Sequence, residues 1–356
     1  LEKNRSDLYG VTISGSKQVE RGSWIVGIDF HHDDVASSRV SEDVASAART
    51  EIAPRFPDGS SMQLLSAYGN GTWAASQRHS LTLGLRLSDV RTRLPSSGVH
   101  NTEISGDIGW VADLDDAWQF TANVGYGFRA PNVFDLGTLG NRPGNRFNIP
   151  NPGLESEHVI HGDLGIRYRG LQSEFSLVVY TMDYGDRITS VSTGATTPDG
   201  RDITQSVNAA SSDIYGVEAS ARIEVDLNWL VNANLAYTRG EQDIGGISEP
   251  ADRIPPLSGY IGIEYAPDSA FGFEAWASIA GAQDRLSARD IRDTRIDPNG
   301  TPGWASLGVR GTWRPSDEWL LTLEASNILD ASYRMHGSGI DATGRNLAVR
   351  VVRTWH

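Results

Sequence analysis

Hydrophobic and polar residues alternate along most of this chain with a period of two. In the segment 118–128 the apolar set is Trp118, Phe120, Ala122, Val124, Tyr126 and Phe128, and polar or small residues lie between them. The same alternation returns in 81–87 and 229–237 and also in 24–30, 175–181, 271–279, 319–325 and 347–355. Because successive side chains of a strand point to opposite faces, each segment predicts a strand with one apolar and one mostly polar face.

The length of these segments distinguishes two kinds of β-protein. A soluble sandwich also buries one face of each strand, but its strands usually have about five or six residues. A tilted strand that crosses a bilayer needs about nine to eleven residues, and many segments here reach that length. Aromatic residues stand at the segment ends: Trp24, Trp118, Trp229, Phe271, Trp313 and Trp319. A girdle at the membrane interface has this placement, so we predict a transmembrane antiparallel β-barrel.

The connections between the segments are of two kinds. Seven are tight and polar, at 20–22, 76–78, 114–117, 169–171, 226–228, 267–270 and 315–317. The others are long and rich in Gly, Asn, Asp, Ser and Arg, and span 31–61, 88–101, 129–152, 184–203, 239–252, 282–302 and 331–345. Bacterial outer-membrane barrels have this layout, with short periplasmic turns and long external loops.

The number of strands indicates that this sequence does not contain a whole barrel. Seven tight hairpins give fourteen strands, and a last strand over 346–355 makes about fifteen. Single-chain bacterial barrels have even counts, because an odd antiparallel count cannot close without a parallel seam. We therefore expect further strands outside this sequence to complete the barrel.

Composition excludes several classes of protein. The net charge of −14 and the scattered arginines argue against a nucleic-acid-binding surface. The absence of cysteine excludes a disulfide framework and a thiolate metal site. No stretch approaches the roughly 18 apolar residues of a membrane-spanning helix. The first residues lack the basic and apolar regions of a signal peptide, so we expect a mature chain or a downstream fragment.

Seven short motifs resemble, in order, those of the C-terminal barrel of TonB-dependent outer-membrane receptors. They are GFRAPN at 127–132, NPGLESE at 151–157, Asn208 followed by YGVE at 215–218, RIPP at 253–256, PGW at 302–304, NILDASY at 327–333 and GRN at 344–346. Each string is short, but all seven occur at suitable separations across essentially the whole chain. Two positions depart from the family pattern, because Ser156 replaces the usual proline and His356 follows the aromatic Trp355.

The resemblance implies that residues 1–356 are the C-terminal portion of a receptor barrel, about 15 strands of a 22-stranded barrel whose plug and first strands are missing. It implies a place in the outer membrane of a Gram-negative bacterium and import of a scarce ligand, such as an iron–siderophore complex, haem or cobalamin. The implied partners are the N-terminal plug and first strands, TonB acting through the plug, outer-membrane lipid and lipopolysaccharide, and a small-molecule metal chelate. No cofactor is implied.

Candidate ligand-binding residues lie in the long connection 129–152. It contains Arg142, Asn145 and Arg146, and Arg129 begins it. Guanidinium groups match carboxylate, phosphate and catecholate-type anions, which suits capture of an anionic chelate. Because Arg129 belongs to the GFRAPN motif, a structural contact with the lumen or the plug competes for it, and Arg142 and Arg146 are the stronger specificity candidates.

The candidate metal ligands are His31 and Asp33, which follow directly on a predicted strand. Imidazole and carboxylate groups suit zinc, copper or iron. In an extended strand His31 and His32 point to opposite faces, so both cannot bind one ion unless the chain turns there. The alternative is a solvated loop that contacts lipopolysaccharide or the lumen.

The sequence offers no enzyme site. His158 and His161 would lie on opposite faces of a strand, and carboxylates such as Glu155 suit a hydrated barrel lumen. The leading hypothesis is a ligand-importing receptor, and the alternative is a receptor-type barrel that serves as a scaffold or surface-binding platform without transport. A passive porin is disfavoured because porins have fewer strands and lack these motifs.

Overall fold

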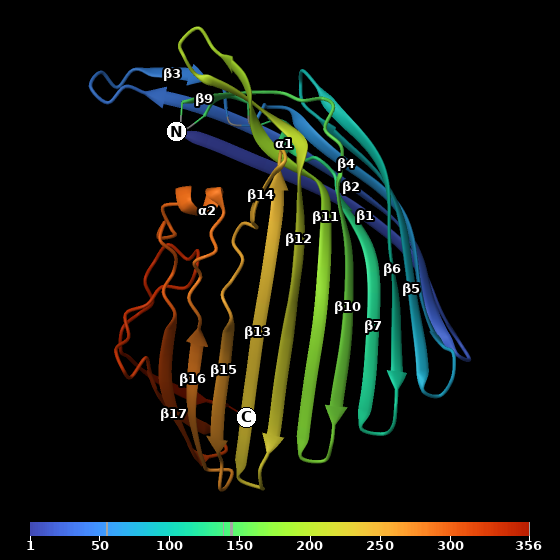
Figure 1. Cartoon of the computed structure of the whole chain (residues 1–356), viewed down its shortest axis with the longest axis vertical. Coiled ribbons are helices and arrows are strands. Elements are labelled where there is room, and N and C mark those ends of the chain that lie inside the picture. The colour runs from blue at the N-terminus through green and yellow to red at the C-terminus, as the bar shows by residue number, and fades with distance from the viewer. Residues whose placement is uncertain (55, 138, 143–144, 356) are drawn as a thin grey trace.

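The chain folds into one curved wall of β-strands (Figure 1). The computed structural model describes residues 1–54, 56–137, 139–142 and 145–355, and the side chain of Arg142 is not among the described groups. Nineteen strands and two five-residue helices lie in these ranges, and neither helix is long and apolar enough to span a membrane. Four strands are short parts of loops, and the other fifteen form the wall.

The wall strands are β1 (Glu2–Val19), β2 (Gly22–Glu42), β4 (Ser60–Ala74), β5 (His79–Arg93), β6 (Gly98–Asp113), β7 (Trp118–Arg129), β10 (Glu157–Arg169), β11 (Ser173–Thr196), β12 (Asp202–Glu224), β13 (Trp229–Ile244), β15 (Ser258–Tyr265), β16 (Phe271–Ala280), β17 (Trp304–Ser316), β18 (Trp319–Ser326) and β19 (Asn346–Arg353). The loop elements are β3 (Arg49–Ile52), β8 (Gly140–Arg142), β9 (Arg146–Ile149), β14 (Ile247–Pro250), α1 (Val133–Gly137) and α2 (Ala288–Arg292).

Each wall strand pairs in antiparallel register with the next wall strand along the chain, as β1–β2 and β2–β4 illustrate. β7 pairs directly with β10, and β13 with β15, so the intervening short strands lie outside the ladder. All seven predicted tight turns lie at one end of the wall, the turn end, and the longer connections gather at the other, the loop end (Figure 1). The predicted fifteen strands and their order are therefore confirmed.

The sheet does not close within this chain. In the described ranges β1 pairs only with β2, and β19 pairs only with β18, so the outer edge of each strand has no strand partner. A backbone edge of this kind presents unpaired N–H and C=O groups.

Four connections are shorter than the sequence predicts. β2 continues to Glu42, β5 and β6 leave only residues 94–97 as a turn, β11 and β12 leave only 197–201, and β13 runs to Ile244 before folding back into β14. These strand ends are mostly polar and hold only scattered apolar residues, so they lack the alternation that marks a strand in the sequence, and backbone pairing extends them. The predicted loops 31–61, 88–101, 184–203 and 239–252 are wrong in extent, while 129–152, 282–302 and 331–345 are confirmed.

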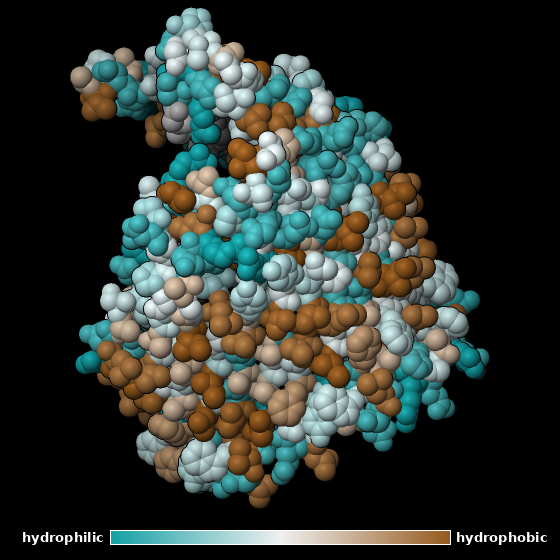
Figure 2. All heavy atoms as spheres, in the orientation of Figure 1, coloured by the Kyte–Doolittle hydropathy of each residue, from teal (hydrophilic) through white to brown (hydrophobic). Residues whose placement is uncertain are grey.

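The outer face of the wall is apolar. Val124, Leu235 and Leu323 are 60%, 43% and 54% exposed, as expected for side chains that face lipid. Figure 2 shows hydrophobic residues gathered in a broad band over the half that holds the tight turns, and hydrophilic residues toward the loops. At the turn end the rings of Trp229 and Tyr265 pack across neighbouring strands with centroids 4.6 Å apart. The predicted aromatic girdle is thereby present.

The inner face is polar, and its side chains pair across strands. The Asn123 amide donates to Asp163 at 3.3 Å, and the Asn232 amide donates to Glu264 at 2.8 Å. Asn232 lies between the apolar Val231 and Ala233 on its strand, and Leu235 on the same face as these two is exposed, so the alternation read from the sequence assigns the faces correctly.

Arginine at two adjacent positions of β13 tests this assignment. Leu235→Arg puts a charge into hydrocarbon and should destabilise the complete barrel by about 2–4 kcal/mol. Asn234→Arg puts the same charge into the hydrated lumen and should leave stability nearly unchanged. Reversible unfolding of the complete receptor in phospholipid vesicles measures both changes. Equal costs at the two positions would contradict the assigned faces.

Candidate functional site

The loop 130–156 lies at the loop end and packs against the inner side of the wall. Leu94, at the top of β5, forms a small buried core with Leu136 of α1 and Leu154. The buried hydroxyl of Thr92 donates to the Pro131 carbonyl at 2.7 Å. The even-numbered residues of β5 face inward, so this loop covers part of the lumen mouth.

The loop is fixed a second time along β12. β9 pairs with the start of β12 in parallel register, in contrast to the antiparallel wall. The Thr204 hydroxyl donates to Asn148 at 2.8 Å, and the Asn151 amide donates to the Ser206 carbonyl at 2.8 Å. A loop held by backbone pairing on one side and a hydrophobic core on the other has a defined shape.

Arg129 connects the wall to this loop. Its Nε donates to Glu157 at 2.6 Å and its Nη1 to Asp135 at 2.7 Å, and Glu157 also accepts the Ile188 N–H at 2.6 Å. The two carboxylates are mostly shielded from solvent, so the charged pairs are stronger than exposed ones. The described contacts of Arg129 are thus structural and join the wall to the loop, and a role of Arg129 in ligand binding or toward the plug stays a prediction.

The other three predicted ligand residues lie together in the β8–β9 hairpin. Arg142 ends β8, and its side chain is outside the described groups; Arg146 is exposed and begins β9. Asn145 has a positive φ of 58° and donates from its amide to the Gly200 carbonyl at 3.0 Å. The structure therefore brings these residues to one hairpin and separates them from Arg129, and their roles in binding remain predictions.

His31 and Asp33 lie inside β2 rather than at the base of a loop. Both face inward, and Asp33 accepts a hydrogen bond from Ser6 at 2.5 Å. His32 lies on the opposite face and pairs with Asp34 at 2.9 Å, as strand geometry requires. No group of three or more His, Cys, Asp or Glu side chains in the described ranges is arranged to hold a metal ion. A metal at His31 and Asp33 would thus need ligands from elsewhere.

The loops 281–303 and 327–345 form the other side of the mouth. Arg253 of the RIPP motif pairs with Asp293 and lies 3.5 Å from the buried Asp290. The Arg295 guanidinium, with Arg253 near it, holds the pKa of Asp293 well below its usual range. Asn327, which is buried, bonds to Ala331 and Thr343 through its amide. These motif residues hold one loop against another.

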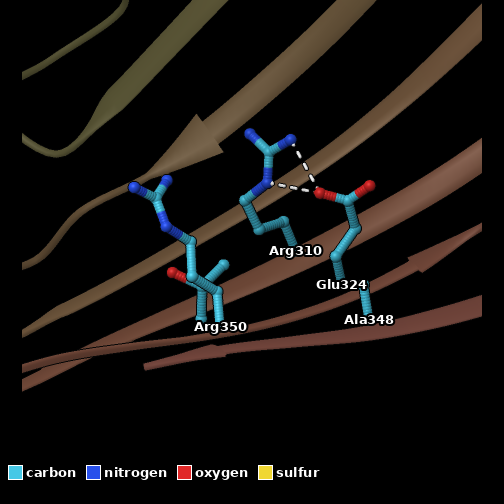
Figure 3. Close-up of a pocket in the computed structure, with 5 residues that line it drawn as sticks. Arg310, Glu324, Ala348 and Arg350 are labelled. Atoms are coloured by element: carbon cyan, nitrogen blue, oxygen red, sulfur yellow. Dashed lines mark hydrogen bonds and ion pairs between the residues drawn. The ribbon is translucent and has the colours of Figure 1, made fainter. Parts of the chain in front are cut away.

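The inner wall carries a charged cluster below this mouth (Figure 3). Arg310 donates from Nε and Nη2 to Glu324 at 3.0 and 2.8 Å and from Nη1 to Glu274 at 2.8 Å. Arg350 of β19 points to the same side of the sheet and, in the described part of the chain, has no ion-pair partner. It stands next to the open edge of the wall.

Sequence reasoning missed several arginines at the mouth. Arg285, Arg289 and Arg292 lie in the predicted loop 282–302, where their number was a visible signal. Arg187 lies in a segment that the sequence predicts as loop and the structure shows as strand. Arg285 pairs with Glu241 at 2.5 Å, and the surroundings of the other three are described below.

Comparison with known proteins agrees with the barrel fold described above. The family model described as "TonB dependent receptor-like, beta-barrel" matches residues 2–328. An iron-regulated outer membrane virulence protein of Vibrio cholerae is 27% identical over 192 residues, which cover 51% of this chain and 28% of that protein. The matched family consists of transport receptors rather than enzymes.

Solved structures share the fold at low identity. The copper transporter OprC superposes with a TM-score of 0.81 at 20% identity, over 99% of this chain and 57% of its own. The FrpB iron transporter of Neisseria meningitidis (F3-3 variant) gives 0.76 at 14% identity, over 98% and 55%. The siderophore receptor PirA of Acinetobacter baumannii gives 0.74 at 16% identity, over 98% and 55%. The chain spans a little over half the length of these structures.

The structural role of Arg129 can be tested by removing its charge. Arg129→Gln leaves Glu157 and Asp135 without their cation, which should loosen the loop 130–156 by about 1–3 kcal/mol. Limited proteolysis and hydrogen exchange should show faster opening of this loop, with little change in the thermal unfolding of the barrel. Arg93→Gln, at an exposed site on the other face, is the control. Unchanged loop protection in Arg129→Gln would contradict the structural role.

Proposed function

The chain belongs to the TonB-dependent receptor-like β-barrel family, and we propose that it forms the larger part of the wall of a receptor that captures a metal chelate and imports it with energy delivered through TonB. The family lies in the outer membrane of Gram-negative bacteria. The observation that carries the proposal is the family match over 2–328 in a wall whose loops fold over its own lumen.

The chemistry of the mouth supports a small anionic cargo. Arg142, Asn145 and Arg146 belong to one hairpin, whose strand β9 is paired with β12. Guanidinium groups at an ordered rim suit an anionic chelate, since a preorganised site loses less entropy on binding. The proteins with similar structures are named as iron, copper and siderophore transporters or receptors. A metal chelate is accordingly the proposed class of cargo.

The open sheet supports a partner that completes the wall. The outer edges of β1 and β19 cannot remain unpaired in hydrocarbon, because each unsatisfied backbone group there costs several kcal/mol. We assign to this partner the plug and about seven strands, the number that brings fifteen to 22. TonB would act through that plug, and outer-membrane lipid and lipopolysaccharide would surround the apolar band. A scaffold without transport is the alternative.

Uptake measurements separate import from a scaffold role. A strain that lacks the receptor gene and is complemented with it should accumulate radiolabelled iron or copper from at least one chelate in a panel of citrate, catecholate and hydroxamate complexes. The uptake should disappear when TonB is removed, because the energy comes through TonB. A receptor that assembles in the outer membrane yet imports none of these chelates would favour the scaffold.

Assembly measurements test the proposed partner. This chain expressed with an outer-membrane export signal should not form a closed barrel, and co-expression with the N-terminal portion of the same receptor should restore one. Closed barrels resist sodium dodecyl sulfate and migrate differently on gels before and after heating, which gives the readout. A heat-modifiable barrel of about 38.6 kDa from this chain without the N-terminal portion would disprove the partnership.

A further inference from the structure

A polar pocket of about 140 Å³ lies at the mouth, between the inner face of strands β11 to β13 and the helix α2. Its lining is Arg187, Ile188, Thr189, Ala210, Gln242, Ile244, Glu249, Asp252, Arg289 and Arg292. Gln242 and Ala210, at its floor, are 2% and 8% exposed. A cavity of this size holds about four or five water molecules. The pocket is therefore a recess in the surface, and the buried side chain of Gln242 makes its floor partly polar.

A β-bulge in β11 aims one arginine into this recess. The register of β11 against β12 shifts between Tyr184 and Arg187, and Asp186 has a positive φ of 55°. The Asn208 side-chain amide donates a hydrogen bond of 2.7 Å to the Asp186 carbonyl. If the register of Tyr184 opposite Ser212 continued unshifted, Arg187 would lie opposite Ala209 and point to the outer face; with the bulge, Arg187 pairs with Ala210 on the inner face. Bulges commonly re-aim a side chain at functional sites.

The acceptors of the pocket are already used. The Gln242 amide donates to both Glu249 and Asp252 at 2.9 Å. The second oxygen of Glu249 accepts the Ala288 N–H at 2.8 Å, and that of Asp252 accepts from Arg289 at 3.1 Å. Burial opposes the charge of Asp252, but hydrogen bonds from Ser287, Gln242 and Arg289 outweigh it and lower its pKa. Both oxygens of each carboxylate thus already accept a hydrogen bond.

The donors of the pocket are in excess. Arg187 donates from Nη1 to Ser212 and to Gln242, and Arg289 donates from Nη1 to Asp252, which leaves other N–H groups of each fork available. Arg292 makes no hydrogen bond or ion pair with the described residues. Three guanidinium groups therefore face two carboxylates, and the recess has a net positive charge although the chain carries −14.

We propose that this pocket binds a carboxylate arm of the imported chelate, with Arg187, Arg289 and Arg292 as its donors, an assignment that rests on the proposed function. A guanidinium fork matches the two oxygens of a carboxylate. Arg187 is half-buried in the wall, and Arg289 and Arg292 reach the recess from exposed positions on α2. The recess is smaller than the roughly 300–1,000 Å³ of a pocket that encloses a whole ligand, so it takes one arm while the rest of the chelate lies in the mouth.

Free citrate, a tricarboxylate without metal, is the probe, and calorimetry on the complete purified receptor is the measurement. Citrate should bind, more weakly as salt rises. Arg292→Gln should weaken it several-fold, and Arg289→Gln with Arg292→Gln by about tenfold or more, as the loss of charged hydrogen bonds predicts. Arg93→Gln removes the same charge from an exposed site outside the pocket and should leave affinity within about twofold of the unmodified receptor.

Three results would overturn the assignment: no citrate binding by the unmodified receptor, unchanged affinity in the double variant, or equally tight binding of inorganic phosphate. Misfolding does not obscure the test, because Arg292 has no described partner to lose and thermal unfolding of Arg292→Gln can be compared directly. Citrate binding without uptake of any chelate would refute import but keep the pocket. Uptake together with unchanged citrate affinity would refute the pocket but keep import.

Discussion

The need to pair every backbone N–H and C=O group in hydrocarbon governs this structure. It requires a continuous ladder, and each of the fifteen wall strands is hydrogen-bonded to its sequence neighbour in the wall. The same requirement leaves two edges, β1 and β19, whose outer groups need partners. The continuous wall and the two edges that need partners thus follow from a single physical constraint, while the apolar band reflects the contact of outward side chains with lipid.

At the loop end of the wall, side-chain hydrogen bonds rather than strand pairing hold the segments together. Arg129, Asn208 and Asn327 belong to the short motifs, and each bonds two segments that are distant or turn sharply in sequence. Their polar atoms are engaged in holding loops in place. Residues that contact cargo are therefore expected outside these motifs.

Electrostatics at the mouth are local and do not follow the net charge. The chain is strongly acidic, yet the recess beside α2 has more guanidinium groups than carboxylates. Its carboxylates are satisfied by Gln242, the Ala288 N–H and Arg289, so their charge orients donors rather than repelling an anion. The half-buried Arg187 and the buried Gln242 lie at the wall side of the recess, and Arg289 and Arg292 add positive charge from its exposed rim.

The sequence by itself determined the wall, because a period of two and a tight turn are local features that specify which neighbours pair and which face is apolar. Val124, Leu235 and Leu323 could be assigned to the outer face on that basis. The ends of the strands could not, since polar extensions such as β2 beyond His31 depend on pairing with β1 and β4. The direction of the Arg187 side chain was likewise decided by the tertiary structure. It depends on a bulge that Asn208 stabilises, and the recess that it enters is completed by a helix about a hundred residues away. The local sequence pattern predicts neither contact.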